Sequence, residues 1–181
     1  KVSVHTVRCV LESNGYVTPK VRRTEAEDQC YEAVRPNQLW QSDILTIRLG
    51  GHNAYLIGFI DDYSRYMTSL GLYRSQTAEH VLETYRRGVG EYGVPKEVLT
   101  DNGRQYVTWR GKSDFTRMLE QRGIRQIVAT PRHPETLGKI ERFWGILQSE
   151  LLDRQIFRTL DAAGDGLTRF AAYYNYDRLH G

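Results

Sequence analysis

Apolar residues follow two different spacings along this chain, and each spacing predicts a different kind of element. In some segments they alternate with polar residues, or run unbroken for a few positions between turn residues, which is typical of β-strands. In others they recur every three or four positions, as on the buried face of a helix. The strand pattern occupies residues 39–49, 54–60, 66–73, 97–100 and 125–129, and the helical pattern residues 75–93, 113–123, 130–151 and 160–174.

The order of these elements predicts the fold class. The first three strands follow one another through short turns, which favours an antiparallel meander. The last two strands alternate with helices, which favours helices packed on the faces of a shared sheet. We therefore predict an α/β fold in which a mixed five-stranded sheet is flanked by helices.

The N-terminal part of the chain has a different character. Residues 3–15 predict one short helix, which cannot bury its apolar face alone. Polarity then rises and periodicity fades over residues 16–37, where two prolines punctuate a run of mixed charge, as in a linker. We therefore divide the chain into residues 1–36 and a core at residues 37–181. Because the sequence begins without methionine, we expect it to be a fragment of a longer protein.

Composition sets broad limits on the function. The 181 residues, 40% of them hydrophobic, can bury one good core, and the net charge of +3 permits nucleic-acid binding without demanding it. Cys9 and Cys30 lack the spacing of a zinc site or a disulfide framework, which fits a reducing cytoplasm. No apolar run is long enough to suggest a membrane span.

Basic residues are concentrated between Asp101 and His133. This segment contains seven arginines and lysines against three acids. Such an excess is either an ordinary solvated surface or a patch that faces the phosphates of a nucleic acid.

Three acidic residues lie where the predicted elements could bring them together. Asp43 lies within the first strand, Asp101 ends the fourth, and Glu141 borders the apolar stripe of the helix that follows the fifth. If the first and fourth strands are neighbours, the two aspartates approach one another and Glu141 can close the site. Three such carboxylates would repel one another unless a cation lay between them, and hard oxygen ligands favour magnesium or manganese.

Each of these carboxylates also has an ordinary structural interpretation. Asp101 precedes an Asn-Gly pair and could simply form a turn. Asp43 could face an exposed edge of the sheet, and Glu141 could be a solvated helix residue. The pattern of single residues leaves both interpretations open.

Two other features are interpreted as structural. Asp61 and Asp62 follow the second strand, and we explain them by turn formation with a local ion pair to Arg65, so they are left out of the site. Trp40 and Trp144 have apolar neighbours and are expected in the core instead of on a base-stacking surface.

The segments around the carboxylates also carry motifs that occur in a defined order. These are LWQSD ending at Asp43, GFIDDYSRY, VPKEVLTDNGRQY around Asp101, HPETLGKIERFWGIL around Glu141, and a closing YYNYDRLH. Together they resemble the D,D,E catalytic core of the retroviral-type integrase and insertion-sequence transposase superfamily, over about residues 37–180. The resemblance implies a ribonuclease H-like fold, in agreement with the predicted element order. It also implies that Asp43, Asp101 and Glu141 bind two Mg²⁺ ions, for which Mn²⁺ can substitute.

The resemblance implies a function as well. Proteins of this superfamily cleave the ends of a DNA element with water and join the new 3′-hydroxyl to target DNA, so we expect a DNA transposase or integrase that works as a homo-oligomer on DNA. A bacterial, nucleoid-associated cytoplasmic location follows from the same resemblance. Residues 1–15 are similar to the last helix of a helix-turn-helix region that precedes such cores. The candidate DNA contacts are Arg104, Arg132, His133, Lys139 and Arg142.

Two other functions remain open at this stage. One is a ribonuclease H-like nuclease that only hydrolyses, and the other is a non-catalytic DNA-binding or assembly protein with a vestigial site.

The sequence also departs from the family pattern. Asp101 and Glu141 are forty positions apart, a longer spacing than usual, and Glu135 and Leu137 replace a glutamine and an asparagine that are common before the glycine of this motif.

Overall fold

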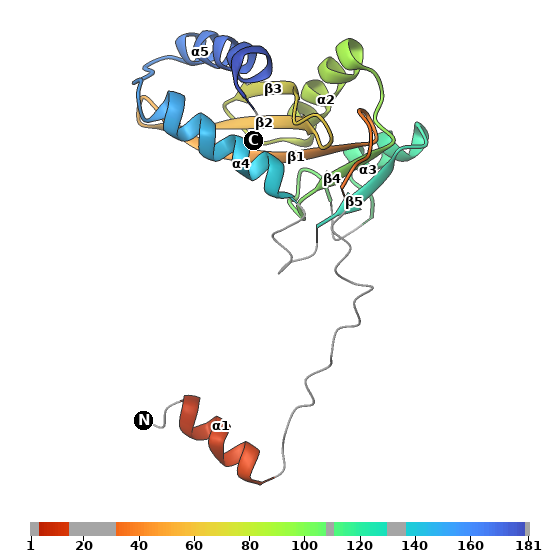
Figure 1. The fold of residues 1–181 in the computed structure, drawn as a ribbon, viewed down its shortest axis with the longest axis vertical. Coiled ribbons are helices and arrows are strands. Elements are labelled where there is room, and N and C mark those ends of the chain that lie inside the picture. Colours follow the sequence, from red (N-terminus) through yellow and green to blue (C-terminus); the bar gives the residue numbers. More distant parts are fainter. Residues whose placement is uncertain (1–3, 15–31, 108–110, 130–136, 180–181) are drawn as a thin grey trace. The chain divides into compact units, whose positions relative to one another are not determined.

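The computed structural model describes residues 4–14, 32–107, 111–129 and 137–179 of the chain (Figure 1). The chain divides into two units, Lys1–Cys30 and Tyr31–Gly181. In the first unit the predicted short helix is present as α1 (Val4–Ser13). The carboxamide of Asn14 donates to the carbonyl of Val10 at 2.8 Å, which satisfies one of the acceptors left at the helix end.

The second unit is built on one mixed sheet of five strands in the order β3-β2-β1-β4-β5. The first three strands form the predicted antiparallel meander, and β4 and β5 continue the sheet in parallel beside β1. The strands are β1 (Leu39–Leu49), β2 (His52–Asp61), β3 (Met67–Tyr73), β4 (Glu97–Thr100) and β5 (Arg125–Val128).

Helices cover both faces of this sheet, as Figure 1 shows. One face is covered by α4 and α5, whose apolar side chains meet Leu39, Leu56 and Leu99 of the strands. The opposite face is covered by α2 and α3 around Trp40 and Phe59. The helices of this unit are α2 (Ala78–Tyr92), α3 (Asp114–Gln121), α4 (Gly138–Leu147) and α5 (Leu160–Ala172), with π-helical turns Gln148–Leu152 and Tyr173–Asp177 after the last two.

The helix starts follow from local side-chain chemistry. Ser113 caps α3 as expected, accepting from the N–H of Thr116 at 3.0 Å. The serine that begins the predicted helix at residues 75–93 is the candidate cap from the sequence, but Thr77 holds that position in α2 and accepts from the N–H of His80. Serine and threonine can both cap a helix, and in this structure α2 begins at Ala78, directly after Thr77. The predicted helix at residues 130–151 is entered in the sequence through Pro131 and Pro134, and these lie outside the described residues.

Trp40 and Trp144 are both buried, which confirms their assignment to the core. Within the described residues no helix is both long and apolar enough to cross a membrane.

Candidate active site

Asp43 and Asp101 meet because β1 and β4 are parallel neighbours in a fixed register. Ser42 pairs with Thr100 at the end of β4, so Asp43 and Asp101 are the next residues along the two chains. Side chains alternate between the faces of a strand, which places Asp101 on the same face as Leu99, the face covered by α4. The condition set by the sequence, that the first and fourth strands are neighbours, is therefore met.

The two carboxylates influence one another electrostatically. Burial raises the pKa of Asp43, and the negative charge of Asp101 raises it further. Hydrogen bonds from the backbone of Ile44 and the indole of Trp144 act in the opposite direction and favour the charged form. The site therefore holds more negative charge than its own donors balance.

The buried hydroxyl of Tyr106 is also affected by the charges of Asp43 and Asp101. Its hydroxyl is buried and lies 2.7 Å from the hydroxyl of Ser42. Burial raises the pKa of Tyr106 well above its usual value, the Ser42 hydrogen bond lowers it, and the charges of Asp43 and Asp101 raise it. The sequence pattern did not connect Tyr106 with the two aspartates.

Trp144 holds the Asp43 carboxylate in place. Its indole N–H donates to Oδ2 of Asp43 at 3.0 Å. The ring reaches this position over Gly58, which pairs with Asp43 across β1 and β2. A Cβ atom on Gly58 would lie 2.8 Å from Cη2 of Trp144. A glycine inside an apolar strand often marks such a close approach, so Gly58 was the available signal in the sequence.

Asp101 takes part in a turn and also lies close enough to Asp43 to influence its pKa. Its Oδ1 accepts a hydrogen bond from the N–H of Gly103 at 2.9 Å, which is a local turn interaction. Its charge also acts on Asp43 across the strand boundary. A turn that fixes one carboxylate oxygen leaves the other for a ligand.

Glu141 lies in the first turn of α4 with an exposed side chain. Among the described residues, no three carboxylate, imidazole or thiol side chains stand close enough to hold a metal ion together. The structure thus brings Asp43 and Asp101 together, and it does not gather Glu141 with them. The aspartate pair fits a divalent cation, because a cation would relieve the repulsion between the two groups and carboxylate oxygens are the ligands that Mg²⁺ prefers.

The candidate DNA contacts differ in their surroundings. Arg104 and Arg142 are exposed, on the loop after β4 and on α4. The ammonium of Lys139 instead contacts Asp62, and the Lys139 side chain is only 20% exposed. Arg132 and His133 lie outside the described residues.

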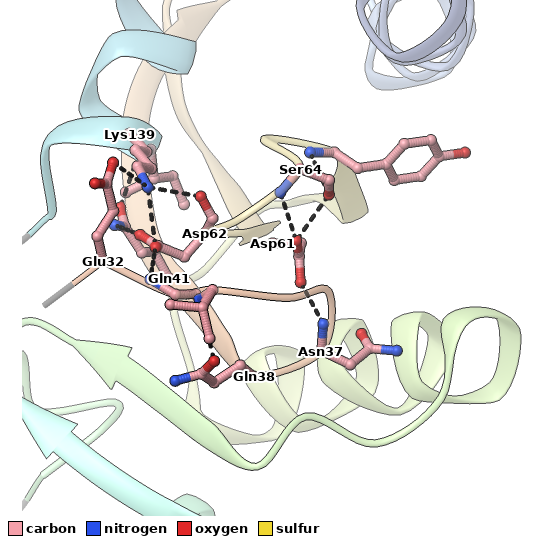
Figure 2. A network of polar contacts seen from close by, with 12 residues as sticks. Glu32, Asn37, Gln38, Gln41, Asp61, Asp62, Ser64 and Lys139 are labelled. Carbon is pink, nitrogen blue, oxygen red and sulfur yellow. Dashed lines mark hydrogen bonds and ion pairs between the residues drawn. The ribbon is translucent and has the colours of Figure 1, made fainter.

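Asp61 and Asp62 are both buried, and the carboxylate of Asp61 makes the turn contacts that the sequence suggested. Asp61 accepts from the N–H and the hydroxyl of Ser64 within its turn, and from the N–H of Asn37 (Figure 2). Asp62 is bound by groups far along the chain, among them Lys139, 77 positions away. Asp62 does lie in the turn after β2, but its carboxylate is bound through tertiary packing and not by groups of that turn.

A mixed sheet with helices on both faces, and a pair of carboxylates at the adjoining ends of β1 and β4, define a ribonuclease H-like core. The chain belongs to the integrase core domain family: residues 33–134 match one family model of that description, and residues 122–181 match a second.

A putative transposase and a retroviral polyprotein are similar to this chain in sequence. It is 25% identical over 181 residues to the putative transposase InsK for insertion sequence element IS150 of Escherichia coli (strain K12). That match covers 98% of this chain and 60% of the relative, so the chain spans about 60% of that protein's length. The Gag-Pro-Pol polyprotein of bovine leukemia virus is 30% identical over 113 residues, which is 62% of this chain and 8% of the polyprotein.

Solved structures show the same fold at low sequence identity. A chain of the simian T-cell lymphotropic virus intasome, in complex with PP2A regulatory subunit B56 gamma, has a TM-score of 0.72 and 21% identity, over 83% of this chain and 52% of that chain. The HTLV-2 integrase catalytic core domain in complex with magnesium, in its dimeric form, has a TM-score of 0.63 and 20% identity, over 82% and 92% of the two chains.

The charge excess at Asp43 predicts that the metal-free site is destabilising. A carboxyl group whose pKa is raised by folding contributes less stability as pH rises from the ordinary aspartate pKa through the raised value. We expect Asp43→Asn to increase the free energy of unfolding of the metal-free protein at pH 7, by about 0.5–2 kcal/mol, the range common for single stabilising substitutions. Urea unfolding at pH 7 in EDTA measures this, and the gain should disappear at a pH below the ordinary aspartate pKa. An equal gain at both pH values would contradict the argument.

Removing the indole N–H of Trp144 should make the charged form of Asp43 less favourable. In Trp144→Phe most of the ring remains buried and the N–H that stabilises the carboxylate is lost. We expect the pKa of Asp43 to rise further, and the affinity for Mn²⁺ to fall about tenfold or more, as for other side chains that orient metal ligands. NMR titration of the Asp43 carboxyl and calorimetry with Mn²⁺ measure the two effects. Trp40→Phe provides the control, because it makes the same chemical change on a buried indole whose N–H donates to Asn37.

Proposed function

We propose that this chain is the catalytic core of a DNA transposase or integrase that cleaves the ends of a DNA element and joins the 3′-hydroxyl to target DNA. The observation that carries the proposal is the meeting of Asp43 and Asp101 at the adjoining ends of β1 and β4, in a chain of the integrase core domain family. A cation would relieve the repulsion between these two carboxylates, and it would also stabilise the charge of the reacting phosphate.

In this proposal Asp43, Asp101 and Glu141 hold two Mg²⁺ ions, which Mn²⁺ can replace. When bound, the ions activate the attacking oxygen and stabilise the leaving oxygen of the phosphate. Trp144 fixes the orientation of Asp43 through its indole N–H. The turn from Asp101 to Gly103 fixes one oxygen of Asp101. Glu141 enters from the first turn of α4, the helix that also carries Trp144.

DNA binding would use basic side chains around this site. Arg104 and Arg142 are exposed and can reach phosphates, and Arg132 and His133 belong to the same proposed surface by their place in the sequence. Residues 1–36 would be the end of an upstream helix-turn-helix-like region with its linker. Because two element ends must be processed together, we propose a homo-oligomer on DNA, in the cytoplasm of a bacterium and associated with its nucleoid.

The experiment combines the chain with a labelled element end, a target DNA and Mg²⁺ or Mn²⁺, and follows joined products on a denaturing gel. The natural element ends of the source genome supply the labelled DNA. Joined product that requires the divalent ion and Asp101 supports the proposal. Joined product that survives Asp101→Asn overturns the assigned site.

A further inference from the structure

A buried polar network joins the start of α4 to strands β1 and β2 (Figure 2). Asp62 directly follows β2 and is 1% exposed. Lys139 is the second residue of α4 and lies two positions before Glu141. Its ammonium lies 2.9 Å from Oδ2 of Asp62 and 2.7 Å from the Asp62 backbone carbonyl oxygen. The ion pair therefore attaches the turn that carries Glu141 to the end of a central strand.

Gln41 makes a second connection between the same elements. Its amide Nε2 donates to Oδ1 of Asp62 at 2.7 Å, and its Oε1 accepts from the backbone N–H of Ile140 at 3.1 Å. The first turn of a helix leaves backbone N–H groups without helical partners. Leu137, at the N-cap of α4, provides no side-chain acceptor for them. Gln41, from β1, takes the place of a local cap.

The Asp62 carboxylate is held from several directions. Besides Gln41 and Lys139, the backbone N–H of Ala33 donates to Oδ2 at 2.8 Å. The carboxylate of Glu32 lies 3.5 Å from the Lys139 ammonium, at the more exposed side of the network. A carboxylate with these donors and an ion pair is well satisfied in the interior, and removing Lys139 would leave a buried charge without its main compensation.

Two residues of the network lie close in sequence to carboxylates of the candidate site. Gln41 lies two residues before Asp43 on the same face of β1, and Lys139 lies two residues before Glu141 on α4. The same small set of bonds therefore relates the strand that carries one carboxylate to the helix turn that carries another.

We propose that Lys139, held by Asp62, is a positioning residue that fixes the first turn of α4, which carries Glu141, beside the end of β2. This replaces the expectation that Lys139 contacts DNA phosphates, since its ammonium contacts two oxygens of Asp62. The role assigned to Glu141 rests on the proposed function. The anchoring of α4 by Lys139 and Asp62 does not, and it can be tested on its own.

The kinetic test compares Lys139→Met with Arg142→Met, an exposed cation three positions further along α4. Methionine keeps the apolar stem and removes the charge in both variants. For Lys139→Met we expect kcat of strand transfer to fall about 10–100-fold with the KM for DNA nearly unchanged, as for side chains that orient metal ligands. Arg142→Met should instead raise the KM for DNA and reduce the salt dependence of DNA binding. If Lys139→Met shows the Arg142 pattern, Lys139 is a phosphate contact and the proposal is overturned.

The structural test needs no activity. Hydrogen exchange of the Ile140 amide, measured by NMR on the full 181-residue chain, should become faster by on the order of tenfold or more in Lys139→Met, while amides of β2 remain protected. Asp62→Asn should have a similar effect, and the double variant should be no worse than the more affected single variant, because both act through one network. Lys139→Arg, which keeps the charge, should restore most of the protection.

The two tests separate the two proposals. If the wild-type chain joins no DNA although Ile140 exchange responds as expected, the proposed function fails and the anchor of α4 stands. If Ile140 exchange is unchanged in both Lys139→Met and Asp62→Asn, the anchor is overturned whatever the activity. If Lys139→Met does not fold, the comparison is made with Asp62→Asn and Lys139→Arg, for which the same exchange pattern decides.

Discussion

Asp101→Asn is expected to abolish the joining of a labelled element end to target DNA while DNA binding persists. The amide keeps the size of the side chain and can still accept from Gly103, so the turn after β4 should survive. It removes a negative charge from the pair that would bind the ions. Because bound ions supply several kcal/mol of transition-state stabilisation, the rate should fall by about a thousand-fold or more.

The matched control for this variant is Asp114→Asn, which makes the same chemical change on an exposed side chain of α3. Its strand transfer should equal that of the wild-type chain. A gel that resolves cleaved and joined DNA gives the readout, and gel-shift binding checks that Asp101→Asn still engages DNA.

The same experiment separates the alternative functions. A nuclease that only hydrolyses would cleave the labelled end in an Asp101-dependent manner and give no joined product. A DNA-binding or assembly protein with a vestigial site would shift DNA and give neither product. Calorimetry then completes the distinction, since a vestigial site would show no Mn²⁺ binding that depends on Asp43 and Asp101.

Gly58→Ala is expected to destabilise the protein by about 1–3 kcal/mol, the usual cost of overpacking a well-filled core. The new Cβ would lie 2.8 Å from Cη2 of Trp144, a separation that real Cβ atoms essentially never show, and 3.0 Å from Cζ2 of the same ring. The Trp144 ring is buried, so it can yield only by disturbing its neighbours or by moving away from Asp43. We therefore expect weaker Mn²⁺ binding together with the loss of stability.

Gly90→Ala is the control for this prediction, and it should change stability in the opposite direction. Gly90 lies in α2, and a Cβ atom built there meets nothing within 4 Å, so alanine is expected to stabilise the helix by up to about 1 kcal/mol. Urea unfolding of both variants and calorimetry with Mn²⁺ provide the measurements. A Gly58→Ala protein as stable as the wild type, with unchanged Mn²⁺ affinity, would show that Trp144 does not need the space above Gly58.

Local patterns along the chain were sufficient for the elements and their order. The alternation in β1, the apolar run in β2 and the helical spacing in α4 and α5 depend only on residues close in sequence, because each element buries one face or both. The motif order added the family and suggested which carboxylates belong together. The adjacency of β1 and β4 could be stated only as a condition, since strand pairing joins residues far apart in the sequence.

The candidate site was predictable to the level of Asp43 and Asp101 and not to the level of their partners. The donor to Asp43 is Trp144, 101 positions away, and apolar spacing alone assigned that residue to the core. The indole of Trp144 is buried in the core and its N–H also donates to the carboxylate of Asp43. The spacing of apolar residues predicts the burial and gives no information about the hydrogen bond.

The sequence by itself therefore determined the kinds of elements, their order and the residue types available for chemistry, because helices and strands are specified by short-range spacing. The tertiary structure alone decided which side chains meet. It paired Asp62 with Lys139 across 77 positions, and it left Glu141 exposed on α4 while Asp43 and Asp101 came together. These outcomes depend on strand register and on the seating of α4 against the sheet, which are set by packing over the whole domain.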